Sequence, residues 1–262
     1  MSQQDEFYIG YVKKAPVGIA KYLVWVVLIL LILVATTAFI LVRSQKAFSP
    51  SNFEFGRYTQ LTGTLRMKPV PMLELDHGTD LMGDAQRQGV LLVSFGKFGA
   101  RGDLGKMEAE HGELDGKQIT LNGTLIYDEG KLLMELSEGK ASLMEVKADG
   151  PPLIRVLEQD EVSMTGEIID PKCYFGVMKP GEKKPHRSCA IRCISGGIPP
   201  VLKMKENGET DYIILVGPEG EMLNDQVLDK VAEPVRIKGK MAQVNDWWIM
   251  HLNSNDIVRI DG

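Results

Sequence analysis

The segments ITLNGTL, residues 119–125, and VRIKGKM, residues 235–241, carry the pattern that decides the expected fold. Each alternates apolar and polar side chains, as a strand with one buried face does. Each also has a glycine at its fifth position, Gly123 in the first segment and Gly239 in the second. A glycine inside a strand marks a bulge, a sharp bend or a close approach of another backbone. The two segments therefore indicate two copies of one β unit.

The resemblance between the halves extends to their other strand-like segments. Each half begins with a short glycine-centred strand, LTGTL at 61–65 or MTGEI at 164–168, and ends with an apolar strand and a closing strand. The segments that correspond are GVLLVSFG with DYIILVGPEG, LLMEL at 132–136 with WWIMHL at 247–252, and SLMEV at 142–146 with DIVRI at 256–260.

Five short strands with a glycine at the bends are typical of a small five-stranded barrel of the OB type. The sequence thus predicts a mainly β protein with two such barrels in tandem, at 56–148 and 161–262. Between them, residues 149–160 contain Asp-Gly followed by Pro-Pro, which is typical of a linker. A β-sandwich is the alternative fold, because two packed sheets of short strands produce a similar pattern.

The second half contains an insertion. Gly166 and Gly239 are thirteen residues farther apart than Gly63 and Gly123, and most of the excess falls between the first two strands of the second barrel. Residues 171–200 occupy that position. Loops at this end of a small barrel are common binding surfaces, so we expect the function there.

Residues 22–42 read YLVWVVLILLILVATTAFILV and contain no charged side chain. At about 1.5 Å per residue, a helix of this length matches a hydrocarbon core of about 30 Å. We predict a membrane-spanning helix, preceded by a short tail at 1–21 and followed by a linker at 43–55. A cleaved signal peptide is the alternative.

Basic residues on the two sides of this segment are nearly balanced, so the positive-inside rule does not decide the orientation. A short tail is easily left in the cytoplasm while a long domain is exported. We therefore expect the N-terminus in the cytoplasm and the C-terminal domain in the periplasm or outside. The flanking basic residues are Lys13, Lys14 and Lys21 before the segment, and Arg43, Lys46 and Arg57 after it.

All three cysteines lie in the insertion, with the spacing Cys173-x12-His186-x2-Cys189-x3-Cys193. A short helix that begins at Pro185 would place His186, Cys189 and Cys193 on one face, and Cys173 could complete the set from the preceding loop. Three thiolates and one imidazole can fill a tetrahedral metal site. Such soft donors suit Zn, Cu or an iron–sulfur cluster, and Met178 is a further soft candidate ligand.

Two other interpretations of the cysteines stay open. Cys173 could form a disulfide with Cys189 or Cys193 and leave one free thiol, since exported proteins commonly contain structural disulfides. Alternatively, basic neighbours could favour a reactive thiolate. The same basic side chains form a candidate anion site, with a solvated basic loop as its alternative; they are Lys179, Lys183, Lys184, Arg187 and Arg192.

The remaining sequence offers no catalytic motif: it contains no serine-protease-type order, Walker loop or HExxH segment, so we name no catalytic residue and lean toward a protein that is not an enzyme. A net charge of −5 argues against nucleic acid as a partner.

One N-terminal span followed by an exported OB-type barrel is also the layout of the haem chaperone of cytochrome c maturation. This chain resembles that family in layout alone, because the family's C-terminal histidine signature is absent from its sequence.

These observations predict an accessory or metal-handling subunit of a respiratory-type membrane complex. Its partners would be the lipid bilayer and other subunits of that complex. A non-catalytic scaffold subunit with a structural disulfide and a thiol-redox enzyme are the alternatives.

Overall fold

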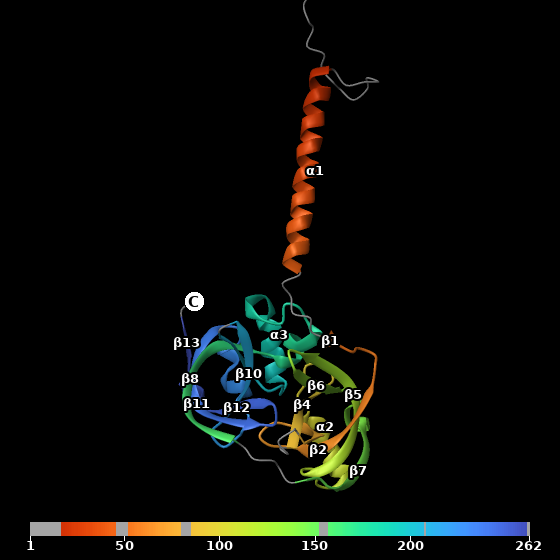
Figure 1. The fold of residues 1–262 in the computed structure, drawn as a ribbon, viewed down its shortest axis with the longest axis vertical. Coiled ribbons are helices and arrows are strands. Elements are labelled where there is room, and N and C mark those ends of the chain that lie inside the picture. The colour runs from red at the N-terminus through yellow and green to blue at the C-terminus, as the bar shows by residue number, and fades with distance from the viewer. Residues whose placement is uncertain (1–16, 46–51, 80–84, 152–156, 207, 261–262) are drawn as a thin grey trace, which may run out of the picture. The chain divides into compact units, whose positions relative to one another are not determined.

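The computed structural model describes residues 17–45, 52–79, 85–151, 157–206 and 208–260. The chain divides into two compact units, Met1–Ser49 and Pro50–Gly262, which are described separately. The first unit contains one helix, α1 (Val17–Gln45), whose described side chains are exposed or partly exposed (Figure 1).

Helix α1 is long and apolar enough over Val17–Arg43 to cross a membrane, although an N-terminal signal sequence would pass the same test. It extends past both ends of the predicted span 22–42. Each added residue continues the i to i−4 hydrogen-bond ladder, so a helix need not end where its apolar run ends. The predicted tail at 1–21 lies mostly outside the described residues, as does part of the linker at 43–55.

The first barrel consists of five strands that close on themselves. The pairing runs β2–β3–β4–β6–β5 and returns from β5 to β2, with β4 and β6 parallel and the other pairs antiparallel. Two further strands, β1 (Asn52–Phe53) and β7 (Leu143–Asp149), pair with β5 from outside the closed ring. The barrel strands are β2 (Thr59–Arg66), β3 (Met72–Thr79), β4 (Ala85–Ser94), β5 (Lys117–Asp128) and β6 (Lys131–Leu136).

The second barrel repeats this connectivity. Strand β8 pairs with β9 and β11, β10 pairs with β9 and in parallel with β12, and β11 pairs with β12 to close the ring. The protein therefore contains two tandem five-stranded barrels with OB topology and not a sandwich. The strands are β8 (Leu157–Ile169), β9 (Val201–Glu206), β10 (Glu209–Val216), β11 (Pro234–Val244) and β12 (Trp247–His251), with β13 (Ile257–Arg259) paired to β11 outside the ring.

The glycines that suggested the duplication occupy equivalent places in the two barrels. A Cβ atom on Gly123 would lie 2.5 Å from the carbonyl oxygen of Glu135, and one on Gly239 would lie 2.5 Å from that of His251. Both contacts join the fourth barrel strand to the fifth. Only glycine allows so close an approach, which explains why the sequence repeats it.

The assignment of strands to the ring differs from the sequence prediction in one respect. The sequence did not predict β3 or β9, the second strand of each barrel, and it counted β7 and β13 in their place. Both missed strands follow prolines, and each alternates apolar and charged residues over only four positions, LELD in β3 and LKMK in β9, which is the shortest run that indicates a strand. Strand β8 also begins at Leu157, inside the predicted linker, because its first residues pair with the end of β11.

The connection between the third and fourth strands of the first barrel contains α2 (Arg101–His111), a helix that the sequence did not predict. It contains Gly102 and Gly105, which weaken a helix, and it lacks a side-chain N-cap. Leu104 and Met107, three residues apart, are fully buried in the core of the first barrel. Packing thus stabilises a helix that local propensity does not favour.

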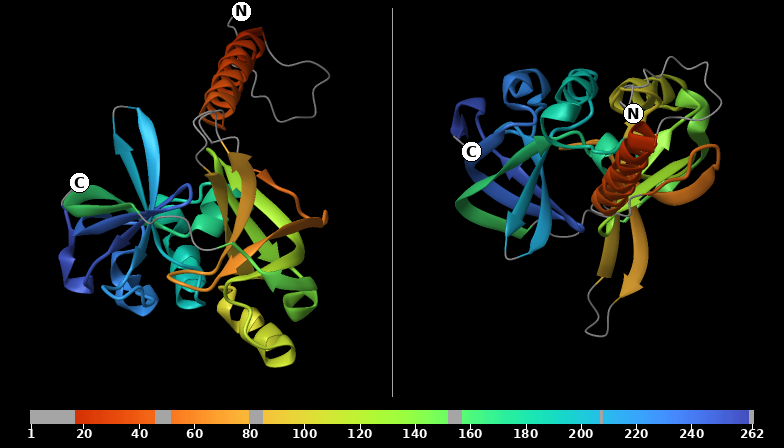
Figure 2. Two further views of the ribbon diagram at one scale, coloured as in Figure 1. Left: turned by 60° about the horizontal axis from the view of Figure 1, so that its bottom comes forward. Right: turned by 90° about the horizontal axis from the view of Figure 1, so that it is seen from above.

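Each barrel has its own apolar core, and a third apolar cluster joins the two barrels. In this cluster Leu91 and Val93 of β4 pack with Trp247 of β12, whose Nε1 atom donates a hydrogen bond of 2.8 Å to the carbonyl oxygen of Gly89. Cys173 and Cys193 belong to the same cluster. The insertion therefore lies between the barrels, as Figure 2 shows.

Candidate metal centre

The insertion between β8 and β9 folds into two helical pieces. A single π turn, η2 (Cys173–Val177), is followed by helix α3 (Lys183–Ser195), which ends at Gly196. The helix predicted from Pro185 is thus present and begins two residues earlier. Proline is tolerated in the first turn because its missing N–H would have no partner within the helix.

Asp170 fixes the start of the π turn and with it the position of Cys173. Its backbone carbonyl oxygen accepts a hydrogen bond of 3.0 Å from the N–H of Tyr174, and its Oδ1 atom accepts one of 3.0 Å from the N–H of Lys172. After the turn, Gly181 lies against the backbone of Tyr174, where a Cβ atom would collide. The loop between the two helical pieces is therefore held close to the cysteines.

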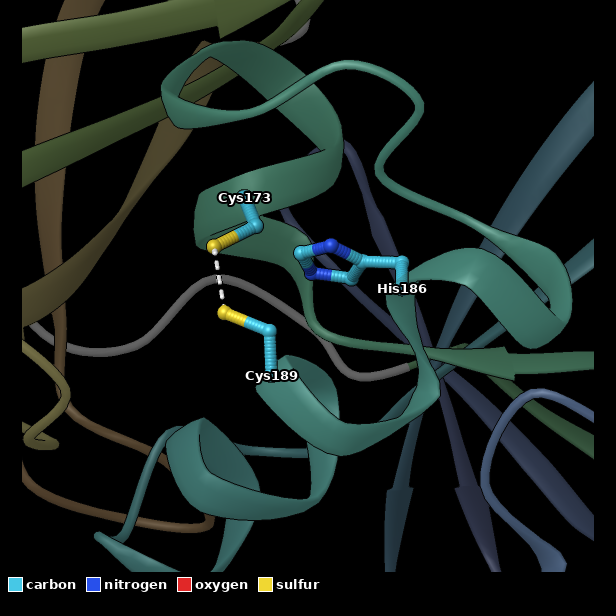
Figure 3. Close-up of side chains that lie close together, drawn as sticks. All are labelled: Cys173, His186 and Cys189. Carbon is cyan, nitrogen blue, oxygen red and sulfur yellow. Dashed lines mark hydrogen bonds between the residues drawn. The ribbon is translucent and has the colours of Figure 1, made fainter.

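Three of the predicted ligands come together. The Sγ atoms of Cys173 and Cys189 and a ring nitrogen of His186 all lie within 4.8 Å of one another, and the two Sγ atoms are 4.0 Å apart. Figure 3 shows the imidazole ring pointing toward the two thiols. Cys173 and His186 are buried, whereas Cys189 is partly exposed. This cluster, Cys173–His186–Cys189, could hold a metal ion.

The fourth predicted ligand, Cys193, belongs to a second group, in which its Sγ atom lies within 4.8 Å of Cys173 and of a carboxylate oxygen of Asp170. The predicted set of four thus falls into two groups that share Cys173. Cys193 follows His186 by seven residues, which is about 10 Å along a helix axis. Residues this far apart share a face but cannot easily reach one ion together.

The buried donors are uncharged without a metal. A hydrogen bond with Cys193, burial and the nearby Asp170 carboxyl raise the pKa of Cys173 well above its ordinary value. Burial lowers the pKa of His186, which keeps the imidazole neutral at pH 7. The Nε2 atom of His186 is buried and has no hydrogen-bond partner among the described residues. A buried nitrogen without a partner is costly, and a bound ion would satisfy it.

One charged neighbour of the cluster, Lys97, was not predicted from the sequence. Lys97, in the loop after β4 of the first barrel, donates a hydrogen bond of 3.4 Å to the Sγ atom of Cys189. This hydrogen bond raises the pKa of Lys97. The loop reaches α3 because Gly99 donates a hydrogen bond of 3.0 Å to the carbonyl oxygen of Gly196 and neither glycine has room for a side chain. The signal available in the sequence was the close spacing of glycines in FGKFGARG, residues 95–102, the loop that contains Lys97.

Met178, a candidate soft ligand in the sequence, lies beside the cluster. Its Sδ atom is 3.7 Å from the Sγ atom of Cys189, and its side chain is 46% exposed. Met178 is therefore more exposed than any of the three cluster residues.

The five predicted anion-binding residues have different surroundings in the structure. Arg187 forms an ion pair with Glu233, and the Nζ atom of Lys179 lies 3.9 Å from a carboxylate oxygen of Asp128. Arg192 is exposed on α3. Lys183 and Lys184 line a cleft of about 670 Å³ on the second barrel together with two lysines that the sequence analysis did not single out, Lys203 and Lys205.

The three cysteines are free thiols in this structure. The 4.0 Å separation of the Cys173 and Cys189 sulfurs is about twice the length of a disulfide bond. As they lie, the two thiols are spaced for a shared ion and not for a covalent bond.

Comparison with known proteins does not identify the chain. No protein-family model matches it, and no curated protein matches it. Among solved structures it is similar to the crystal structure of the tetrameric p202 HIN2, with 13% sequence identity and a TM-score of 0.24, over 82% of this chain and 99% of that chain.

Proposed function

We propose that this protein is a membrane-anchored metal-handling accessory protein, and that Cys173, His186 and Cys189 bind its metal ion. The observation that carries the proposal is the approach of two sulfurs and one ring nitrogen to within 4.8 Å of one another. The unpartnered Nε2 atom of the buried His186 supports it. These donors suit Zn, Cu or an iron–sulfur cluster.

The remainder of the molecule is consistent with an accessory role. Helix α1 would anchor the chain, with the N-terminus in the cytoplasm and the barrels exported. The second barrel provides the ligands, while the first contributes Lys97 and holds the insertion in place. Partners from a respiratory-type membrane complex would then exchange the ion with the partly exposed Cys189.

The test is a metal and thiol count on the full-length protein, purified without oxygen in detergent. We expect one soft metal ion per chain, and we expect Cys189→Ser and His186→Asn to lose it. Ser188→Ala is the matched control, because Ser188 is exposed on the same helix between the two ligands. Cys193→Ser should retain most of the metal, because Cys193 belongs to the second group.

The absence of stoichiometric Zn, Cu and Fe, together with one disulfide and one free thiol by mass spectrometry, would overturn the proposal. That result would favour the scaffold subunit with a structural disulfide. Turnover of a disulfide or peroxide substrate that depends on Cys189 would favour the thiol-redox enzyme.

A further inference from the structure

We infer that the ion is monovalent copper and that the thioether of Met178 is one of its ligands. The inference rests on the proposed function, because it assigns the metal and a further ligand to the cluster Cys173–His186–Cys189. It is carried by the contact between Met178 and Cys189, which neither a zinc site nor an iron–sulfur cluster requires.

The sulfur separations fit donors around one small ion. With metal–sulfur bonds of about 2.3 Å, two donors lie about 3.8 Å apart in a tetrahedral site and about 4.6 Å apart in a linear one. The Sγ atom of Cys189 lies 4.0 Å from that of Cys173 and 3.7 Å from the Sδ atom of Met178. Cys189 thus lies at ligand spacing from both a second thiol and a thioether.

The chemistry of the donors selects the metal. Zinc in proteins is bound by thiolate, imidazole and carboxylate, whereas a thioether is a soft ligand suited to monovalent copper. An iron–sulfur cluster needs four cysteines, or two cysteines and two histidines. The two groups, which share Cys173, together offer three cysteines and one histidine, and this set matches neither requirement. A mixed thiolate and thioether set therefore favours Cu(I).

The exposure of two of the proposed ligands and the positive charge of Lys97 favour a site that exchanges its ion. Met178 and Cys189 reach solvent, whereas Cys173 and His186 are buried, so an incoming ion meets the exposed sulfurs first. Two cysteine thiolates and one Cu(I) ion together carry one net negative charge. The ammonium group of Lys97, 3.4 Å from Cys189, balances that charge without occupying a ligand position.

The test is a titration of the full-length protein, in detergent and without oxygen, with Cu(I) in competition with a chromophoric Cu(I) chelator, and a parallel titration with Zn(II). We expect Met178→Leu to weaken Cu(I) binding at least about tenfold, the scale on which even outer-shell partners change metal affinity. Zn(II) binding should change less than twofold. X-ray absorption spectra of the copper-loaded proteins should show one sulfur ligand fewer on copper in Met178→Leu than in the wild type.

Met144→Leu is the matched control, because Met144 is also exposed but belongs to β7 of the first barrel. It should leave both affinities unchanged. Equal Cu(I) affinity in Met178→Leu and the wild type would overturn the inference while leaving a metal site in place. Failure of the wild type to bind either metal would overturn the proposed function itself.

Discussion

The Nζ atom of Lys97, in the first barrel, lies 3.4 Å from the Sγ atom of Cys189, in the insertion of the second barrel. The two residues are 92 positions apart in the chain. The candidate site is thus completed by both copies of the duplicated fold, although every ligand comes from one of them.

Replacement of Lys97 by methionine tests this contribution. We expect Cu(I) affinity to fall about two- to fivefold, because solvent-exposed charge pairs are worth about 0.2–1 kcal/mol. The loss should diminish at high salt, since salt screens exposed charges. The measurement is the same chelator competition, with Lys106→Met as control, because Lys106 is exposed in the first barrel but pairs with Asp103. A tenfold or larger loss that salt does not change would contradict an electrostatic role.

Lys172, next to Cys173, connects the insertion to the first barrel through an ion pair and two hydrogen bonds. Its side chain is buried, and its Nζ atom lies 2.5 Å from a carboxylate oxygen of Glu135 and 2.7 Å from the carbonyl oxygens of Ser94 and Gly96. Lys172→Met would leave the buried Glu135 without its counter-charge. We expect the free energy of unfolding to fall by about 3–5 kcal/mol in urea titrations followed by tryptophan fluorescence.

A second variant separates charge from packing at this position. Lys172→Met combined with Glu135→Leu removes both charges, and it should recover much of the lost free energy of unfolding. The control Lys230→Met, at a surface pair with Asp229, should change stability by less than about 0.5 kcal/mol. If the double variant were no more stable than Lys172→Met, the buried charge would not be the cause.

The parts of the fold that could be predicted from sequence are those set by local pattern. Gly123 and Gly239 mark the same strand contact in both barrels. The insertion was located because Gly166 and Gly239 are farther apart than Gly63 and Gly123. The spacing of His186 and Cys189 predicted the helical face on which both ligands lie. Each of these signals is a short pattern or a spacing along the chain, so no knowledge of the tertiary fold was needed.

The parts that could not be predicted depend on contacts between distant segments. Helix α2 forms because Leu104 and Met107 are buried, despite two glycines that weaken it. Lys97 reaches Cys189 because its loop contacts α3 closely through Gly99 and Gly196, which are distant in the sequence. The division of the four ligands into two groups follows from where Cys173 meets α3, which spacing alone does not define.

Gly196 controls how closely the loop containing Lys97 approaches α3. A Cβ atom there would overlap the carbonyl oxygen of Lys97. Gly196→Ala should therefore lower the free energy of unfolding by about 1–3 kcal/mol, as overpacking does. It should also lower Cu(I) affinity to the level of Lys97→Met, because the loop must move away from Cys189. Gly105→Ala, in α2 with open space around it, should instead stabilise the protein by about 1 kcal/mol.

Tyr212, at the interface between the barrels, is expected to make the protein less stable at alkaline pH. Its side chain is buried, and its hydroxyl group donates a hydrogen bond to Glu129 and lies 3.2 Å from the hydroxyl group of Tyr174. Burial, followed by the hydrogen bond to Glu129, raises the pKa of Tyr212 in the folded protein far above its ordinary value. Burial also raises the pKa of Tyr174.

A raised folded-state pKa makes the protein less stable at high pH. Below about pH 10 both states keep the tyrosine proton, and the full stability is present. Above that value the unfolded chain loses the proton while the folded chain retains it, so the free energy of unfolding falls by up to about 1.4 kcal/mol per pH unit for each such group. In urea titrations between pH 10 and 11.5, the free energy of unfolding of Tyr212→Phe should fall less steeply with pH than that of the wild type. The difference in slope should be up to about 1.4 kcal/mol per pH unit, the contribution of one tyrosine. Tyr174→Phe should reduce the slope in the same direction, and an unchanged slope in both variants would show that these hydroxyl groups ionise as readily in the folded protein as in the unfolded chain.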